Sequence, residues 1–322
     1  MLKRSQLILA IVAVSFFCSC AVAKMLHEQN EGQKTHSPED YGFVRSQHVR
    51  NDIVYAPGLR GEKRLRLDVH WNDSKTPQPI AFVIHGGGWF MGSKDQAFQD
   101  RVSDLIANHG YVVFNLDYRM IPKYTVVDCI QDTFGAIVWA KKHAKEFGGD
   151  PMRAGATGFS AGGHLSGMVA TAGDRMDVFP PTGQKGAEYN ASVKVAVPFY
   201  GVYDLLTAPR DVFPVPMFLN RLFYRYVFIG NPDKNKEIGR KISPITYISD
   251  HTPPQLVVCG DADSLKLYPQ SIEYVEALKK AGRTVEFITV KGADHAFNGQ
   301  YWTPESQNAH KAMLDFFDKY LK

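Results

Sequence analysis

The alternation of short apolar runs with helical periodicity is the feature that most constrains this fold. A largely continuous apolar run is typical of a strand buried on both faces of a parallel sheet. Such runs occupy residues 80–84, 111–116, 193–199, 255–259 and 285–290. Helical spacing of apolar residues marks residues 95–108, 127–147, 269–281 and 304–320. We therefore expect the α/β class, with a mostly parallel central sheet and helices on both faces.

Two earlier segments have a different period. Residues 49–55 and 65–71 alternate apolar and polar side chains. They predict an antiparallel pair of strands, joined through Pro57 and Gly58 to Gly61.

The N-terminus has the pattern of an export signal. Lys3 and Arg4 precede an apolar run at residues 7–17, and Ala21-Val22-Ala23 resembles a cleavage site. The run is short for a bilayer span, so we expect a signal peptide at 1–23, a secreted or periplasmic protein and no stable membrane span. An uncleaved anchor and lipidation at Cys20 are the alternatives. Residues 24–47 are expected to be a flexible leader before one domain at 48–322.

Charge and cysteine content restrict the partners. Without Lys3 and Arg4 the formal net charge of +4 becomes about +2, and no basic cluster is interleaved with aromatics, so nucleic acid is not an expected partner. Cys129 and Cys259 lie in apolar segments and are predicted to be buried free thiols. No zinc-like Cys/His spacing occurs, and neither metal nor cofactor is expected. These patterns leave the oligomeric state open.

One pentapeptide suggests a nucleophile. Gly158-Phe159-Ser160-Ala161-Gly162 fits G-x-S-x-G, between a predicted strand and a predicted helix. On such a turn the serine hydroxyl projects from strained backbone, and side chains at the two glycines would collide with neighbouring elements. The helix N-terminus favours negative charge beside the serine. The motif alone also fits an ordinary loop before a helix, so its context must decide.

The context supplies an acid and a base. A serine hydroxyl needs a base to accept its proton, and the base needs a carboxylate to orient it. Asp263 and His295 follow successive predicted strands, and the carboxyl ends of parallel strands share one edge of a sheet. We predict Ser160 as nucleophile, His295 as base and Asp263 as acid. Asp261 is the alternative acid, and Asp294 is expected to be a turn residue.

A run of glycines follows the strand at residues 80–84. In His85-Gly86-Gly87-Gly88-Trp89, consecutive glycines let bare backbone N–H groups approach a ligand. The N–H groups of Gly87, Gly88 and Ala161 are predicted to form an oxyanion hole. A flexible loop or a phosphate-binding turn is the alternative, although the spacing and lysine of a phosphate loop are missing.

Together these motifs resemble α/β-hydrolases of the hormone-sensitive-lipase-like and acyl-esterase branch, which includes feruloyl and acetyl-xylan esterases. The resemblance covers about residues 48–320. It rests on His85-Gly-Gly-Gly-Trp89, Asp117-Tyr-Arg119, Gly149-Asp-Pro151, Gly158-Phe-Ser-Ala-Gly-Gly-His164, Gly260-Asp-Ala-Asp263 and Asp294-His-Ala-Phe297. It implies the same triad and oxyanion hole. Phe159 stands where lipase-like members often carry Asp, which favours the carbohydrate-associated branch.

The segment at about 203–245 is longer than a simple crossover and is a possible cap insertion. Residues 217–228 are apolar nearly all round, and Arg221 and Arg225 form their only basic stripe. They predict either a helix buried against the sheet or a cap whose aromatic side chains line the site. Trp89 is expected to serve packing rather than the pocket wall. His310 is expected on the surface of the last helix.

We expect a secreted serine carboxylesterase. It would act on small-molecule or carbohydrate-linked esters of short-chain or aromatic acids, through an acyl-enzyme and without a cofactor. A related amide hydrolase, resembling an arylformamidase or an exopeptidase, would use the same triad. A non-catalytic binding protein on this fold typically lacks one triad member.

Overall fold

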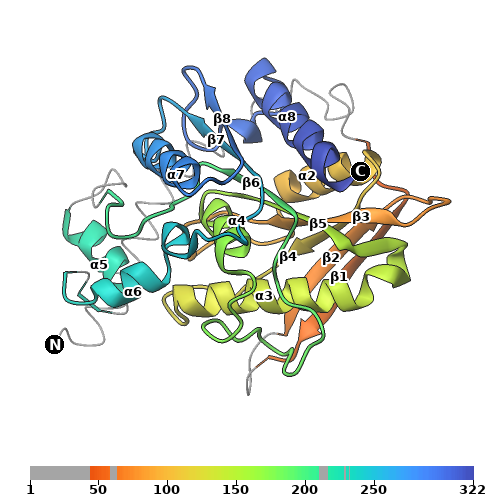
Figure 1. The fold of residues 1–322 in the computed structure, drawn as a ribbon, viewed down its shortest axis with the longest axis horizontal. Coiled ribbons are helices and arrows are strands. Elements are labelled where there is room, and N and C mark those ends of the chain that lie inside the picture. The colour runs from red at the N-terminus through yellow and green to blue at the C-terminus, as the bar shows by residue number, and fades with distance from the viewer. Residues whose placement is uncertain (1–43, 59–63, 210–216, 228–229, 232) are drawn as a thin grey trace.

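The computed structural model describes residues 44–58, 64–209, 217–227, 230–231 and 233–322, and its eight strands form one sheet (Figure 1). The strands are β1 (His48–Ala56), β2 (Leu65–Trp71), β3 (Gln78–Ile84), β4 (Val112–Leu116), β5 (Gly149–Phe159), β6 (Val195–Phe199), β7 (Gln255–Gly260) and β8 (Val285–Val290). The α-helices are α2 (Ala97–Asn108), α3 (Val126–His143), α4 (Ala161–Ala172), α5 (Met217–Val227), α6 (Lys236–Lys241), α7 (Tyr268–Lys280) and α8 (Pro304–Leu321).

The strand order is β1-β2-β4-β3-β5-β6-β7-β8. β1 and β2 are antiparallel, as are β2 and β4, and all other neighbours are parallel. The predicted α/β class and the predicted antiparallel strand pair are both confirmed.

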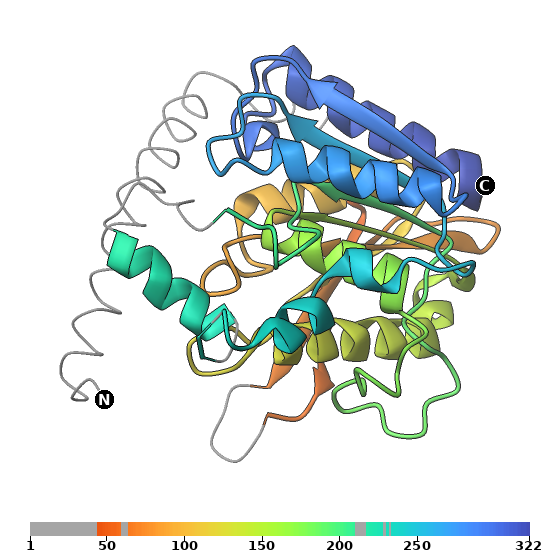
Figure 2. The same ribbon diagram turned by 60° about the vertical axis from the view of Figure 1, so that its left-hand side comes forward.

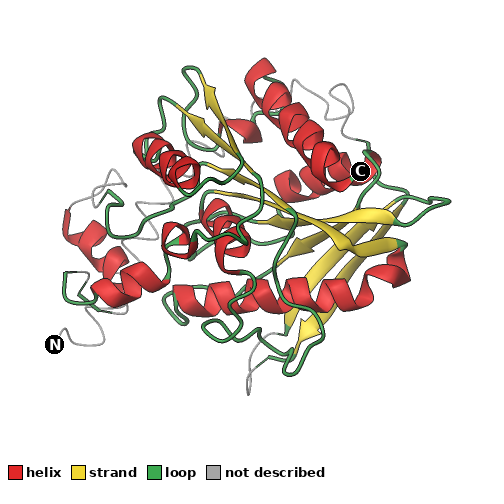
Figure 3. Cartoon of the chain, in the orientation of Figure 1, coloured by secondary structure: helices red, strands yellow, loops and turns green. Residues whose placement is uncertain are grey.

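Helices cover both faces of the sheet (Figure 3). Alternate residues of β3 show why this strand is apolar throughout. Ile80 and Phe82 belong to the core that α3 and α4 close, whereas Ala81 and Val83 belong to the core that α2 and α8 close. Because successive strand side chains point to opposite faces, a strand between two helical layers needs apolar residues at every position.

The first described residues already pack against the domain. Ser46, in the predicted leader, is buried, and its N–H and Oγ donate to Asp104 Oδ1 at 3.1 and 2.6 Å. Packing therefore begins before residue 48. The predicted signal peptide and the leader as far as residue 43 lie outside the described residues. Within the described ranges, every helix is too short or too polar to cross a membrane.

The thiols of Cys129 and Cys259 are free and buried, as predicted. The prediction for His310 is wrong, because this side chain is only 3% exposed. Its ring lies 6.3 Å from that of Phe98 and 6.2 Å from that of Phe199. His310 shares its side of α8 with the buried Met313 and Phe317, three and seven positions further on, so helical periodicity turns all three toward the sheet.

The start of α4 lies directly against the end of β3. A Cβ at Gly162 would lie 2.0 Å from the carbonyl oxygen of Ile84 and 2.6 Å from that of His85. Both obstructing atoms are backbone of a central strand, which cannot move without disturbing the sheet. Only glycine therefore permits this approach.

Gly162→Ala is expected to lower the free energy of unfolding by about 3 kcal/mol or more, because the new methyl group overlaps backbone atoms. Gly282→Ala is the control: it has φ of +70° but nothing within 4 Å of the added Cβ, so only about 1 kcal/mol of backbone strain is expected. Urea unfolding measures both. Equal losses would contradict the proposed close approach.

Three buried histidines make stability depend on pH. Burial lowers the pKa of His85, His164 and His310 to about 4. Between pH 6.5 and about 4 the folded state binds fewer protons than the unfolded state, so stability present above pH 6.5 is lost as pH falls. Asp117, whose pKa burial raises to about 6, and Asp100, whose pKa burial also raises, act in the opposite direction but are two groups against three.

We expect the free energy of unfolding to fall between pH 7 and pH 5, by up to about 2 kcal/mol for each histidine. His310→Leu should remove one such contribution, so its loss over this interval should be smaller. Urea unfolding at the two pH values measures the difference. An identical loss in the variant would count against the role of His310.

Candidate active site

Ser160 occupies the sharp turn between β5 and α4. Its backbone has φ 57° and ψ −114°, which a residue with a side chain rarely adopts. Its N–H donates to the carbonyl oxygen of Phe199 at 3.1 Å, and its carbonyl accepts the N–H of His164 at 2.9 Å. These bonds to β6 and α4 hold the strained turn in place.

Three distant segments meet at this turn. His295 Nε2 lies 2.9 Å from Ser160 Oγ, and His295 Nδ1 lies 2.8 Å from Asp263 Oδ2. The Asp263 side chain is fully buried, and that of His295 is 12% exposed. The three side chains thus form a continuous chain of hydrogen bonds whose serine end is near solvent.

The two candidate acids have different partners. Asp263 Oδ1 accepts the backbone N–H groups of Leu265 and Leu267 at 2.9 and 3.4 Å, which leaves Oδ2 directed at His295. Asp261 Oδ1 instead accepts the N–H of Gly292 at 2.6 Å, in the turn after β8. The geometry therefore favours Asp263 over Asp261 as the partner of the histidine.

Asp294 joins the loops that carry the acid and the base. Its Oδ1 accepts the backbone N–H groups of Ser264 at 2.7 Å and of His295 at 2.6 Å. Burial would raise the pKa of Asp294, but these hydrogen bonds hold it below its ordinary value. A residue expected only to make a turn therefore also fixes the separation of Asp263 and His295.

Tyr200 packs against the base, and sequence reasoning did not identify it. The edge of one ring meets the face of the other, with centroids of Tyr200 and His295 4.7 Å apart and an interplanar angle of 62°. The Tyr200 hydroxyl donates to the side-chain oxygen of Asn298. The available signal was position, because Tyr200 directly follows β6 at the edge where Ser160 and Asp263 also follow their strands.

The glycine-rich loop after β3 lies against the serine turn. A Cβ at Gly86 would be 2.6 Å from the carbonyl oxygen of Phe159 and 3.4 Å from Ser160 Cβ. Gly87 and Gly88 have φ of 110° and 60°. Ala161 is the first residue of α4, where backbone N–H groups have no carbonyl partner within the helix. The backbone at Gly86 therefore lies against the serine turn, next to the start of α4.

Buried polar groups hold both ends of the glycine-rich loop. The rings of His85 and Tyr118 stack with centroids 4.1 Å apart, and the Tyr118 hydroxyl donates to the His85 carbonyl at 2.9 Å. At the far end of the loop, the buried Lys94 ammonium lies 3.0 Å from Asp68 Oδ1 and 2.5 Å from Asp95 Oδ1. Burial opposes its charge, but these carboxylates raise the pKa of Lys94. The loop is thus fixed at both ends.

The helix predicted at residues 217–228 is α5, and it stands apart from the strands (Figure 2). Phe223 stacks on Trp89 at a centroid distance of 6.4 Å and meets Phe90 edge-on at 5.9 Å. The helix therefore packs on the glycine-rich loop, while Arg221 and Arg225 are exposed. Trp89 is 3% exposed, in agreement with a packing role. Residues 210–216, 228–229 and 232 of the possible insertion lie outside the described residues.

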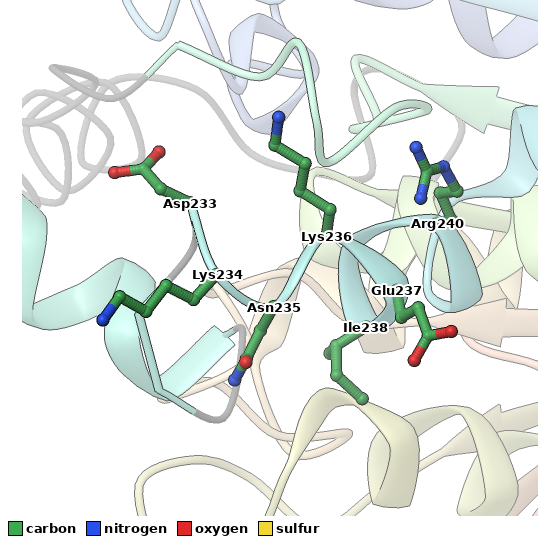
Figure 4. Close-up of a pocket in the computed structure, with 7 residues that line it drawn as sticks. All are labelled: Asp233, Lys234, Asn235, Lys236, Glu237, Ile238 and Arg240. Atoms are coloured by element: carbon green, nitrogen blue, oxygen red, sulfur yellow. The ribbon is translucent and has the colours of Figure 1, made fainter.

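A separate open hollow of about 440 Å³ lies beside α6 (Figure 4). It is lined by Asp233, Lys234, Asn235, Lys236, Glu237, Ile238 and Arg240. All of these come from one short segment and none belongs to the hydrogen-bonded triad, so the hollow offers no reacting group. In the part of the chain that the structure describes, no three His, Cys, Asp or Glu side chains are grouped to hold a metal ion.

Comparison with known proteins identifies the family of this chain and relatives that are named esterases. The BD-FAE family model matches residues 67–278. Esterase LipQ of Mycobacterium tuberculosis is 31% identical over 302 residues, which cover 90% of this chain and 68% of LipQ. The probable carboxylic ester hydrolase LipM of the same organism is 37% identical over 223 residues, 68% of this chain and 49% of LipM.

A solved structure gives the same picture of the fold. A truncated carbohydrate esterase from gut microbiota superposes with a TM-score of 0.72 at 23% identity, over 85% of this chain and 96% of that one. The likeness at this identity is one of fold. On the family match and the two curated relatives, the chain belongs to the BD-FAE family and is an α/β-hydrolase enzyme of the carboxylic ester hydrolase class.

Proposed function

We propose that this enzyme hydrolyses its ester through a covalent acyl-serine. Ser160 Oγ attacks the ester carbonyl while His295 Nε2 accepts its proton. His295 then gives that proton to the departing alcohol, and water activated by the same imidazole releases the acid. The observation that carries this proposal is the unbroken hydrogen-bond chain from Ser160 through His295 to Asp263.

Asp263 would act by fixing the tautomer of the base. Its Oδ2 accepts from Nδ1 of His295, which leaves Nε2 free of a proton and able to take the one from Ser160. The resulting imidazolium is stabilised by the buried carboxylate. Backbone N–H groups of Gly87, Gly88 and Ala161 would hold the negative oxygen of the tetrahedral intermediate.

The proposed substrates are esters of short-chain or aromatic acids, including esters carried on carbohydrate. The carbohydrate part is supported by the fold of the gut carbohydrate esterase and by Phe159 in the elbow motif. Export to the periplasm or outside the cell is supported by the sequence pattern of residues 1–23, and lipid attachment at Cys20 is the variant of this proposal.

Ser160→Ala is expected to reduce kcat for p-nitrophenyl acetate by about a thousandfold or more, because no acyl-enzyme can form. Ser166→Ala is the matched control on the same helix. Its hydroxyl donates to the Gly163 carbonyl, away from the triad, so kcat should stay within about twofold of the parent value. Unchanged turnover in Ser160→Ala would eliminate the proposed mechanism.

The two neighbouring aspartates provide a second test. Asp263→Asn should lower kcat by about a thousandfold or more, because the amide can stabilise the wrong tautomer of His295. Asp261→Asn should leave kcat within a few fold and mainly weaken the turn after β8. Steady-state kinetics on both variants decide the assignment, which would be reversed if Asp261→Asn were the inactive one.

A substrate panel tests the acyl preference and the bond type. We expect kcat/KM for acetyl, butyryl or feruloyl esters to exceed that for the octanoyl ester by about tenfold or more. Aminoacyl-anilides should be cleaved more slowly than p-nitrophenyl acetate. Faster cleavage of the anilides would instead identify an amide hydrolase that uses the same side chains.

A further inference from the structure

His164 lies one helical turn after Ser160 and uses both ring nitrogens in hydrogen bonds. Trp89 Nε1 donates to His164 Nδ1 at 3.1 Å, and His164 Nε2 lies 2.7 Å from the carbonyl oxygen of Ile242. The His164 side chain has no exposed surface. One imidazole therefore connects the helix of the serine, the glycine-rich loop and the residue that follows α6.

The partners of His164 determine its protonation. An indole N–H can only donate, so Nδ1 must carry a lone pair, and a carbonyl oxygen can only accept, so Nε2 must carry the proton. The ring is thus neutral in a single tautomer. Its burial lowers its pKa to about 4, which keeps it neutral at physiological pH. This histidine is therefore suited to a fixed structural hydrogen bond and not to proton transfer.

Trp89 needs a stabilising contact of this kind because its backbone is strained. Its φ is +62°, which is unusual for a bulky residue, and it directly follows Gly88. Its carbonyl accepts the N–H of Ile121 at 2.9 Å, and its indole is held by His164. Strained conformations persist only where surrounding contacts determine them. The bond to His164 attaches this strained residue to α4, the helix that begins directly after the serine.

We propose that His164 is a positioning residue that holds the oxyanion loop in register with Ser160 through the indole of Trp89. This inference rests on the function proposed above. The loop and the serine follow different strands, and this hydrogen bond is one of the contacts that hold them in position relative to each other. Because α6 ends next to Ile242, the same imidazole also fixes the C-terminal side of the possible cap insertion to the loop.

The test uses variants that remove this bond and keep an aromatic ring at each position. Trp89→Phe deletes the indole N–H, and His164→Phe deletes both ring nitrogens. Each should lower kcat for p-nitrophenyl acetate about tenfold with KM within about twofold, less than the loss of an oxyanion donor itself. The kcat of the double variant should be little lower than that of His164→Phe alone, because both substitutions remove the same Trp89–His164 hydrogen bond.

A conservative variant and a control separate positioning from stability. His164→Gln keeps an acceptor and a donor and should recover part of the lost kcat. His70→Asn removes another fully buried histidine, bonded to Asp104 at the opposite edge of the sheet, and should reduce stability while kcat stays unchanged. A fluorophosphonate label reacts with the active serine, so the amount of label bound gives the number of folded sites and allows kcat to be expressed per site. The rate of labelling is a second measurement, because a displaced oxyanion loop should slow it.

The outcomes distinguish this inference from the function beneath it. If Ser160→Ala abolishes turnover while Trp89→Phe and His164→Phe keep full kcat per labelled site, the positioning role is overturned and the mechanism stands. If the variants merely unfold more easily, as His70→Asn does, the positioning role is likewise overturned. If Ser160→Ala retains turnover, both proposals fail together.

Discussion

The close approach of α4 to the end of β3 is the constraint on which the site depends. The absent side chain of Gly162 lets the start of the helix lie against the carbonyl oxygens of Ile84 and His85. This contact brings the turn that bears Ser160 next to the loop that begins at Gly86. In a parallel sheet, the serine turn and the glycine-rich loop both lie at the edge where the strands end. They become neighbours because α4 packs directly against the backbone at the end of β3.

A second set of contacts brings Asp263 and His295, the proposed acid and base, to the serine. Asp263 and His295 lie on loops after β7 and β8, and flexible loops would not keep hydrogen-bonding distances by themselves. Asp294 connects the two loops through backbone N–H groups, and Tyr200 packs against the imidazole. The geometry of the triad is therefore maintained by side chains outside it, which is common where reacting groups must be held within a fraction of an ångström.

Polar burial is concentrated beneath the glycine-rich loop. Lys94 with its carboxylates, His85 stacked on Tyr118, and His164 between Trp89 and Ile242 all lie behind the same stretch of backbone. A buried polar group is costly unless it is paired, and Lys94 and His164 are paired by these contacts. These contacts hold a loop in which Gly87, Gly88 and Trp89 all have positive φ.

The sequence by itself determined the strands, the long helices and the residue types of the triad, because periodicity and turn chemistry are local properties of the chain. Only the tertiary structure decided which residues surround that triad. The sequence-based assignment of His310 to the surface was wrong because a single polar residue does not reveal which helix face meets the sheet. Asp294, Tyr200 and the bond between Trp89 and His164 join segments far apart in the chain. Such contacts depend on how the layers of the fold pack on each other, and a local sequence pattern does not encode which distant residues meet.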